Sequence, residues 1–125
     1  DMAYSDTLEL VQGDTLPRVV VTLKDASEAA SGATLDPNNP DTWAPIDLNG
    51  ASVKLRIREL GSSTVKATLT MTVTDPDNGI ATPDFPAPAL DTAGIFEGEI
   101  EATFQDGSIQ TVVDLLKLKV RAAFG

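Results

Sequence analysis

The sequence predicts an all-β domain, an immunoglobulin-like sandwich of about seven antiparallel strands with a long loop at about residues 25–45. Three observations carry this prediction. Apolar and polar residues alternate with a period of two, which is typical of half-buried strands. Clusters of Gly, Pro, Asn and Asp separate the alternating runs. The chain has 125 residues, the length of one such domain, so we expect a single domain over residues 1–125.

The first part of the chain supplies two predicted strands and then a segment without a strand pattern. Residues 8–10 and 19–23 alternate, with Val19, Val21 and Leu23 on one face of the second run. Residues 25–45 are rich in Ala, Ser, Gly, Asp, Asn and Pro, so we expect a long loop there. A short helical turn within residues 26–33 is left open.

Alternation resumes after Asn49-Gly50 and continues to the end of the chain. In the last run the phase slips between Val113 and Leu116, which predicts a bulge or a change of sheet partner. The same spacing of strands also fits a jelly roll or a small barrel. The predicted strands cover residues 53–57, 65–73, 80–82, 96–104 and 109–121.

Three of these strands carry rows of like charge on their polar face. In an immunoglobulin-like sandwich they would be strands C, F and G, with F in the middle. We therefore expect the acidic strand between the two basic ones, with ion pairs on both sides, because another order would place like charges together. The rows are Lys54, Arg56 and Arg58, then Glu97, Glu99 and Glu101, then Lys117, Lys119 and Arg121.

The composition argues against several classes of function. The chain has neither cysteine nor histidine, so it lacks the commonest nucleophiles, general bases and transition-metal ligands. We expect no enzyme activity and no cofactor. A net charge of −10 repels nucleic acid and anionic membranes, and no apolar run reaches the roughly 20 residues of a membrane span. The N-terminal residues also lack the pattern of a signal peptide.

Several segments together resemble a known family. The segments are Gln-Gly-Asp at 12–14, Ile-Asp-Leu-Asn-Gly-Ala-Ser-Val at 46–53, Val-Thr-Asp-Pro-Asp-Asn-Gly-Ile at 73–80, Leu-Asp-Thr-Ala-Gly-Ile-Phe-Glu-Gly-Glu-Ile at 90–100 and Phe-Gln-Asp-Gly at 104–107. They are similar to the immunoglobulin-like N-terminal domain of bacteriophage baseplate upper proteins and to related modules of phage tail and fibre proteins.

The resemblance implies a non-enzymatic virion structural protein, made in the host bacterial cytoplasm. It would act in the tail, baseplate or capsid surface through contacts with other virion proteins or as a homo-oligomer within the virion. A host-surface carbohydrate-binding adhesion module is the alternative. Sugar sites usually need exposed aromatic platforms, and this chain has few aromatic residues.

Asp75, Asp77 and Asn78 before Gly79 have two interpretations. They match a fragment of a calcium loop but lack its later glutamate. They are also ordinary turn formers, which is the interpretation we adopt, so we expect no metal. The acidic row of the predicted strand F likewise suggests either paired catalytic carboxylates or a charged ladder, and we adopt the ladder.

Trp43, the only tryptophan, lies in the predicted loop. It either caps the open end of the sandwich or anchors a protein interface, where tryptophan is enriched. Long loops in compact domains are typically functional or disordered. Prolines also restrict the free chain and lower the entropy lost on ordering. We therefore predict a protein interface formed by Trp43, Pro40 and Pro45.

Overall fold

The computed structural model describes residues 2–3, 7–11, 20–84, 92–112 and 116–122. Within these residues the chain forms strands and two turns of 3-10 helix, η1 (Pro40–Thr42) and η2 (Pro76–Asn78), and no α-helix. Residues 12–14, Val19 and Val113, which entered the predictions above, lie outside the described part. The strands are β1 (Met2–Ala3), β2 (Thr7–Val11), β3 (Val21–Thr22), β4 (Lys24–Ala29), β5 (Trp43–Pro45), β6 (Ser52–Glu59), β7 (Val65–Asp75), β8 (Ile80–Pro83), β9 (Gly94–Thr103), β10 (Ile109–Thr111) and β11 (Leu116–Arg121).

The described strands form two sheets. The larger sheet has the order β2-β11-β9-β6-β7-β8-β3, with β10 paired to β9, and the smaller has the order β1-β4-β5. Neighbouring strands are antiparallel except β2 and β11, which run parallel. This parallel pair departs from the purely antiparallel arrangement that the sequence predicts.

The larger sheet bends over itself at β7. The first part of β7 pairs with β6, and its last part, from Met71 to Asp75, pairs with β8. Val21 on β3 and Leu118 on β11 stand near opposite ends of the strand order, yet both belong to one core cluster. The strands therefore enclose the core in two layers, and the predicted all-β, immunoglobulin-like sandwich is confirmed.

The core follows from the alternation of the strands. Inward positions of β6 and β9 are apolar, and their side chains are almost completely buried. The buried cluster consists of Val21, Leu23, Ile46, Leu48, Val53, Leu55, Ile57, Leu69, Met71, Ala81, Phe96, Ile100, Ala102, Val112, Leu118 and Val120. Val65 departs from the predicted inward row and is 48% exposed. A register shift between Ile57 and Arg58 places Val65 opposite the outward-facing Arg58.

The predicted order of the charged strands is confirmed. Strand β9 lies between β6 and β11 and pairs with both. The predicted slip in the last run is confirmed as well. Thr111 and Leu116 are five residues apart, whereas their partners on β9, Glu101 and Gly98, are three apart. The run keeps β9 as its partner throughout, and β11 gains β2 as a second neighbour on its other side.

The expectation of a segment without strands at residues 25–45 needs correction. Strands β4 and β5 pair as an antiparallel hairpin, and no helical turn forms within residues 26–33. The sequence of β4, Lys-Asp-Ala-Ser-Glu-Ala, contains no typical strand former. Pairing with β1 on one side and β5 on the other supplies the hydrogen bonds that its composition does not predict. We call residues 24–45 the arm.

A tight junction joins the arm to the body. The amide of Leu23 donates to the carbonyl of Gly79 at 2.8 Å, and the amide of Ile46 donates to the carbonyl of Leu23 at 2.9 Å. Gly79 has a φ of +68°, and a Cβ there would lie 2.5 Å from the carbonyl oxygen of Leu23. Only glycine fits this position without displacing backbone, so the chain enters and leaves the arm at a fixed place.

Candidate protein-interaction surfaces

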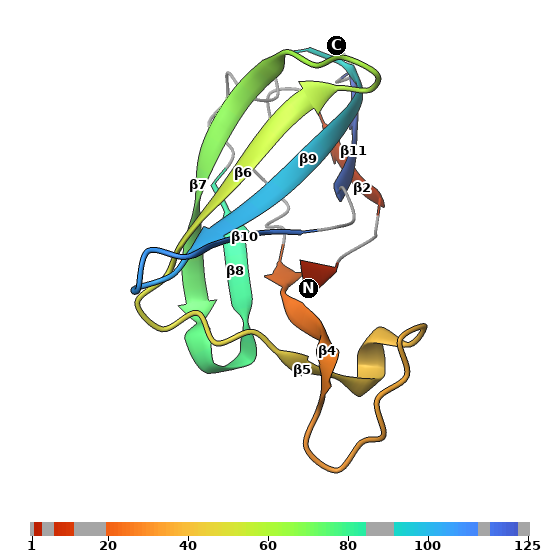
Figure 1. The fold of residues 1–125 in the computed structure, drawn as a ribbon. Coiled ribbons are helices and arrows are strands. Elements are labelled where there is room, and N and C mark those ends of the chain that lie inside the picture. The colour runs from red at the N-terminus through yellow and green to blue at the C-terminus, as the bar shows by residue number, and fades with distance from the viewer. Residues whose placement is uncertain (1, 4–6, 12–19, 85–91, 113–115, 123–125) are drawn as a thin grey trace.

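The arm projects from one end of the sandwich (Figure 1). Its side chains are exposed or partly exposed, and Trp43 is the one buried residue within residues 24–45. Trp43 is not a member of the core cluster described above. The arm therefore adds little to the core of the body and presents most of its surface to the surroundings.

Trp43 holds the arm in shape from inside. Its side chain is 7% exposed, and its indole Nε1 donates a hydrogen bond of 2.9 Å to the carbonyl oxygen of Asp36. The Thr42 hydroxyl accepts from the amide of Asp36 at 2.9 Å and donates to the carbonyl of Asn39 at 2.8 Å. The amide of Ala30 closes the hairpin by donating to the carbonyl of Thr42 at 2.8 Å.

The three residues predicted to form an interface therefore differ in position. Pro40 and Pro45 are exposed, whereas Trp43 lies beneath the surface of the arm. The indole N–H already donates a hydrogen bond within its own hairpin, and the ring does not extend outward as an anchor. A partner that contacts the arm would meet its prolines and carboxylates, with Trp43 supporting them.

The arm is acidic. The hydroxyl of Ser27 donates to Asp25 Oδ1 at 2.6 Å, and this hydrogen bond is the main cause that lowers the pKa of Asp25. Lys24 Nζ donates to the carbonyl of Pro40 at 3.2 Å and so ties the start of the arm to η1. The ionisable residues of the arm are one lysine, Lys24, and four acids, Asp25, Glu28, Asp36 and Asp41.

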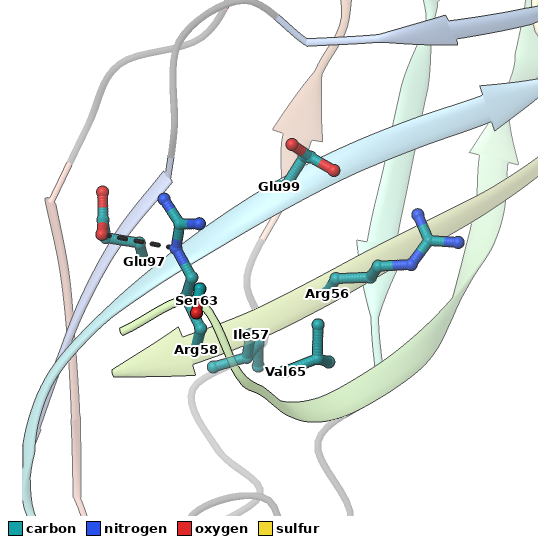
Figure 2. Close-up of a pocket in the computed structure, with 7 residues that line it drawn as sticks. All are labelled: Arg56, Ile57, Arg58, Ser63, Val65, Glu97 and Glu99. Carbon is teal, nitrogen blue, oxygen red and sulfur yellow. Dashed lines mark ion pairs between the residues drawn. The ribbon is translucent and has the colours of Figure 1, made fainter. Parts of the chain in front are cut away.

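A second surface is the outer face of β6, β9 and β11, where the predicted charged rows lie side by side. Register places Lys54 opposite Glu101, Arg56 opposite Glu99, and Arg58 opposite Glu97. Arg56 reaches diagonally to Glu101, with Nη1 2.9 Å from Oε2, and this hydrogen bond raises the pKa of Arg56. Arg58 Nε lies 3.5 Å from Glu97 Oε1 (Figure 2). The predicted ion pairs between β6 and β9 are thus confirmed.

The sequence predicts ion pairs on both sides of β9. Between β9 and β11 the described residues form none. Lys117 stands opposite Glu97, which already pairs with Arg58, and Lys119 stands opposite Ile95. Lys117 and Lys119 are exposed, and among the described residues neither has a carboxylate within 4.0 Å. These two lysines, which we call the lysine edge, have Glu97 on β9 and Glu9 on β2 among their register partners.

The cavity beside the ion pairs is small. Its volume is about 60 Å³, room for a few waters, whereas sites for small organic ligands are typically about 300–1,000 Å³. Figure 2 shows Arg58 turned toward Glu97 and Arg56 turned away from it. The geometry is that of a charged ladder with solvent access. The lining residues are Arg56, Ile57, Arg58, Ser63, Val65, Glu97 and Glu99.

A hollow that the sequence did not predict lies at the end of the outer face, beside two exposed apolar side chains. Leu60 and Ile95 are 55% and 51% exposed, and the amide of Leu60 donates to the carbonyl of Ile95 at 3.0 Å. The signal in the sequence was Ile95, which occupies an outward position in a row otherwise made of glutamates. The hollow has a volume of about 260 Å³ and is lined by Glu59, Leu60, Ala93, Gly94, Ile95 and Phe96.

The Asp75–Gly79 segment forms the turn η2 with Gly79 at its end. Asn78 Nδ2 donates to Asp75 Oδ2 at 2.8 Å, and Asn49 Nδ2 donates to Asp77 Oδ1 at 2.7 Å. The carboxylates thus accept from amides that hold the turn. Over the described ranges, no group of three or more Asp, Glu, His or Cys residues is arranged to hold a metal ion. No helix of those ranges is long and apolar enough to cross a membrane.

No family model and no curated protein matches the chain. Among solved structures, that of murine CRIg is similar to it. The identity is 11%, 97% of each chain is covered, and the TM-score is 0.40.

Proposed function

We propose that this chain is a non-enzymatic structural protein of a bacteriophage virion, an assembly module of the tail, baseplate or capsid surface. It acts through contacts with other virion proteins after synthesis in the host bacterial cytoplasm. The observation that carries the proposal is the arm. Residues 24–45 form an ordered hairpin that stands out from the body and lends no side chain to the core cluster.

The arm is costly for a domain that needs only to fold. Each ordered residue loses about 1–2 kcal/mol of backbone entropy, and burial in the core does not offset that loss here. The hairpin is instead held by its own hydrogen bonds around Asp36, Thr42 and Trp43. A segment preorganised in this way lowers the entropy lost when a partner binds.

The segments that resemble baseplate upper proteins give the arm its context. The parts of them that the structure describes, such as residues 73–80 and 104–107, form turns and strand ends that shape the body. In that family, domains of this kind position themselves in the particle by protein contacts. A projecting arm and an open charged sheet face suit the same role.

The distribution of aromatic side chains favours protein partners over sugars. Sugar sites usually present exposed aromatic rings. Trp43 and Phe96 are buried and Phe104 is half-buried, and these are the aromatic residues whose side chains the structure describes.

Mass spectrometry of purified particles tests the proposal. The host strain that carries the gene is induced, and particles are purified on a density gradient. We expect the chain to sediment with the particles at a copy number comparable to other structural proteins. Its absence from the particles would overturn the proposal. A glycan array with the isolated protein should show no selective binding, and specific capture of one glycan would favour adhesion instead.

A further inference from the structure

We propose that copies of this chain associate head to tail, with the arm of one copy seated against the lysine edge of the next and the hollow beside it. The inference rests on the proposed assembly role and names a second copy as a partner.

The arm and the lysine edge carry opposite charge. Lys117 and Lys119 are exposed on β11, and the described side chains form no ion pair with either, although Glu97 and Glu9 are register partners on the neighbouring strands. The arm offers exposed carboxylates, and those of Glu28 and Asp41 form no ion pair within the described part of the chain. An acidic hairpin therefore fits beside the lysine edge, where opposite charges select the partner and the register.

A hollow with two exposed apolar side chains, Leu60 and Ile95, lies beside those lysines. Lys119 is the register partner of Ile95, whose exposed side chain lines the hollow together with Leu60. Contiguous exposed apolar side chains rimmed by charge are typical of contact sites. The tip of the arm carries exposed Pro37 and Pro40, which are compact and apolar and suit a shallow hollow of about 260 Å³.

The arm leaves one end of the body, and the carboxyl end of β6, next to the hollow, lies at the other end (Figure 1). The arm of one molecule therefore cannot reach its own hollow, so the contact joins two molecules. Because the two surfaces differ, the interface is heterologous, and repetition gives a ring or a filament. Both are arrangements that a particle built around an axis uses.

Charge-reversal variants test this inference by sedimentation velocity over a range of protein concentrations. The face variant is Lys117→Glu with Lys119→Glu, and the arm variant is Glu28→Lys with Asp41→Lys. Lys54→Glu is the control, since it reverses an exposed base on β6 that does not line the hollow. Tryptophan fluorescence verifies that the arm of each variant is folded.

We expect the wild-type chain and the control to form species that grow beyond the dimer as concentration rises. Each double variant alone should remain a monomer. An equimolar mixture of the two should associate again, because the intact arm of the face variant meets the intact face of the arm variant, and the reversed charges of the other arm and face are also opposite in sign. A wild-type chain that stays monomeric, a mixture that stays monomeric, or a double variant that still dimerises alone would each overturn the inference. If the chain stays a monomer in sedimentation but is present in purified particles, self-association is wrong and the proposed function is retained.

Discussion

The indole N–H of Trp43 donates a hydrogen bond of 2.9 Å to the main-chain carbonyl of Asp36, seven residues earlier in the chain. This contact ties the outer loop of the arm to the strand that returns to the body. It lies outside the main core cluster. The shape of the arm therefore depends on a local contact, and the arm and the body are expected to respond differently to substitution.

Trp43→Ala should open the arm and leave the body folded. Hydrogen exchange at the amides of Ala30 and Thr42 should accelerate strongly, while amides of β6 and β9 keep their protection. Trp43→Phe retains most of the apolar volume and removes the donor, so it should cost the arm only about 1 kcal/mol. If Trp43→Ala unfolds the whole domain in one transition, the separation between arm and body is wrong.

Gly79→Ala should destabilise the protein by roughly 3 kcal/mol or more, because its Cβ would strike the carbonyl oxygens of Leu23 and Ile46. Gly107→Ala is the matched control. Gly107 also has a positive φ, but no atom lies within 4 Å of its Cβ position, so only the left-handed backbone cost of roughly 1–2 kcal/mol applies. Urea unfolding measures both. Equal losses would contradict the account of the junction.

The hairpin between β9 and β10 should lose support in acid. Ser108 donates to Asp106 Oδ1 from its hydroxyl at 2.6 Å and from its amide at 2.9 Å, and these bonds lower the pKa of Asp106 below its ordinary value of 3.8. A carboxylate whose pKa is lowered by folding stabilises above the unfolded pKa and ceases to do so as pH falls through the folded value.

Asp106→Asn keeps an acceptor but does not titrate. The difference in free energy of unfolding between wild type and variant should therefore shrink as pH falls from about 5 to about 3. Urea unfolding at several pH values measures it. A difference that is constant over this range would show that the Asp106 contact does not depend on ionisation.

Calcium should not stabilise the protein. The carboxylates of Asp75 and Asp77 accept hydrogen bonds from Asn78 and Asn49, which explains their positions without an ion. The melting temperature should be the same in excess calcium and in EDTA. A rise of several degrees with calcium would reveal a site, because a ligand that binds only the folded state must stabilise it.

The body of the fold was predictable because its signals are local and redundant. Alternation set the inward faces of β6 and β9, and the sorting of charge by sign set the order of β6, β9 and β11. Each of these strands carries its pattern in its own sequence. Turn residues such as Asp106-Gly107 then fixed where the chain reverses.

The arm and the hollow were not predictable for the opposite reason. Strand β4 has the composition of a loop and is a strand because β1 and β5 pair with it. Trp43 is buried within its own hairpin, and no pattern within residues 25–45 predicts that hairpin. The hollow depends on β6 ending beside the start of β9, so that Leu60 meets Ile95 across 35 residues of sequence. Such features arise from contacts between distant segments.

Site-specific cross-linking within the particle tests the central claim most directly. A photoreactive benzoylphenylalanine replaces Pro40 at the exposed tip of the arm, and in a control it replaces Thr68, exposed on β7. Particles are assembled with each variant, irradiated and analysed by mass spectrometry. We predict that position 40 cross-links to another structural polypeptide or to a second copy of this chain, and that position 68 does so far less. Particles in which position 40 forms no cross-link, or no more than position 68, would contradict the claim that the arm is the contact by which this protein acts.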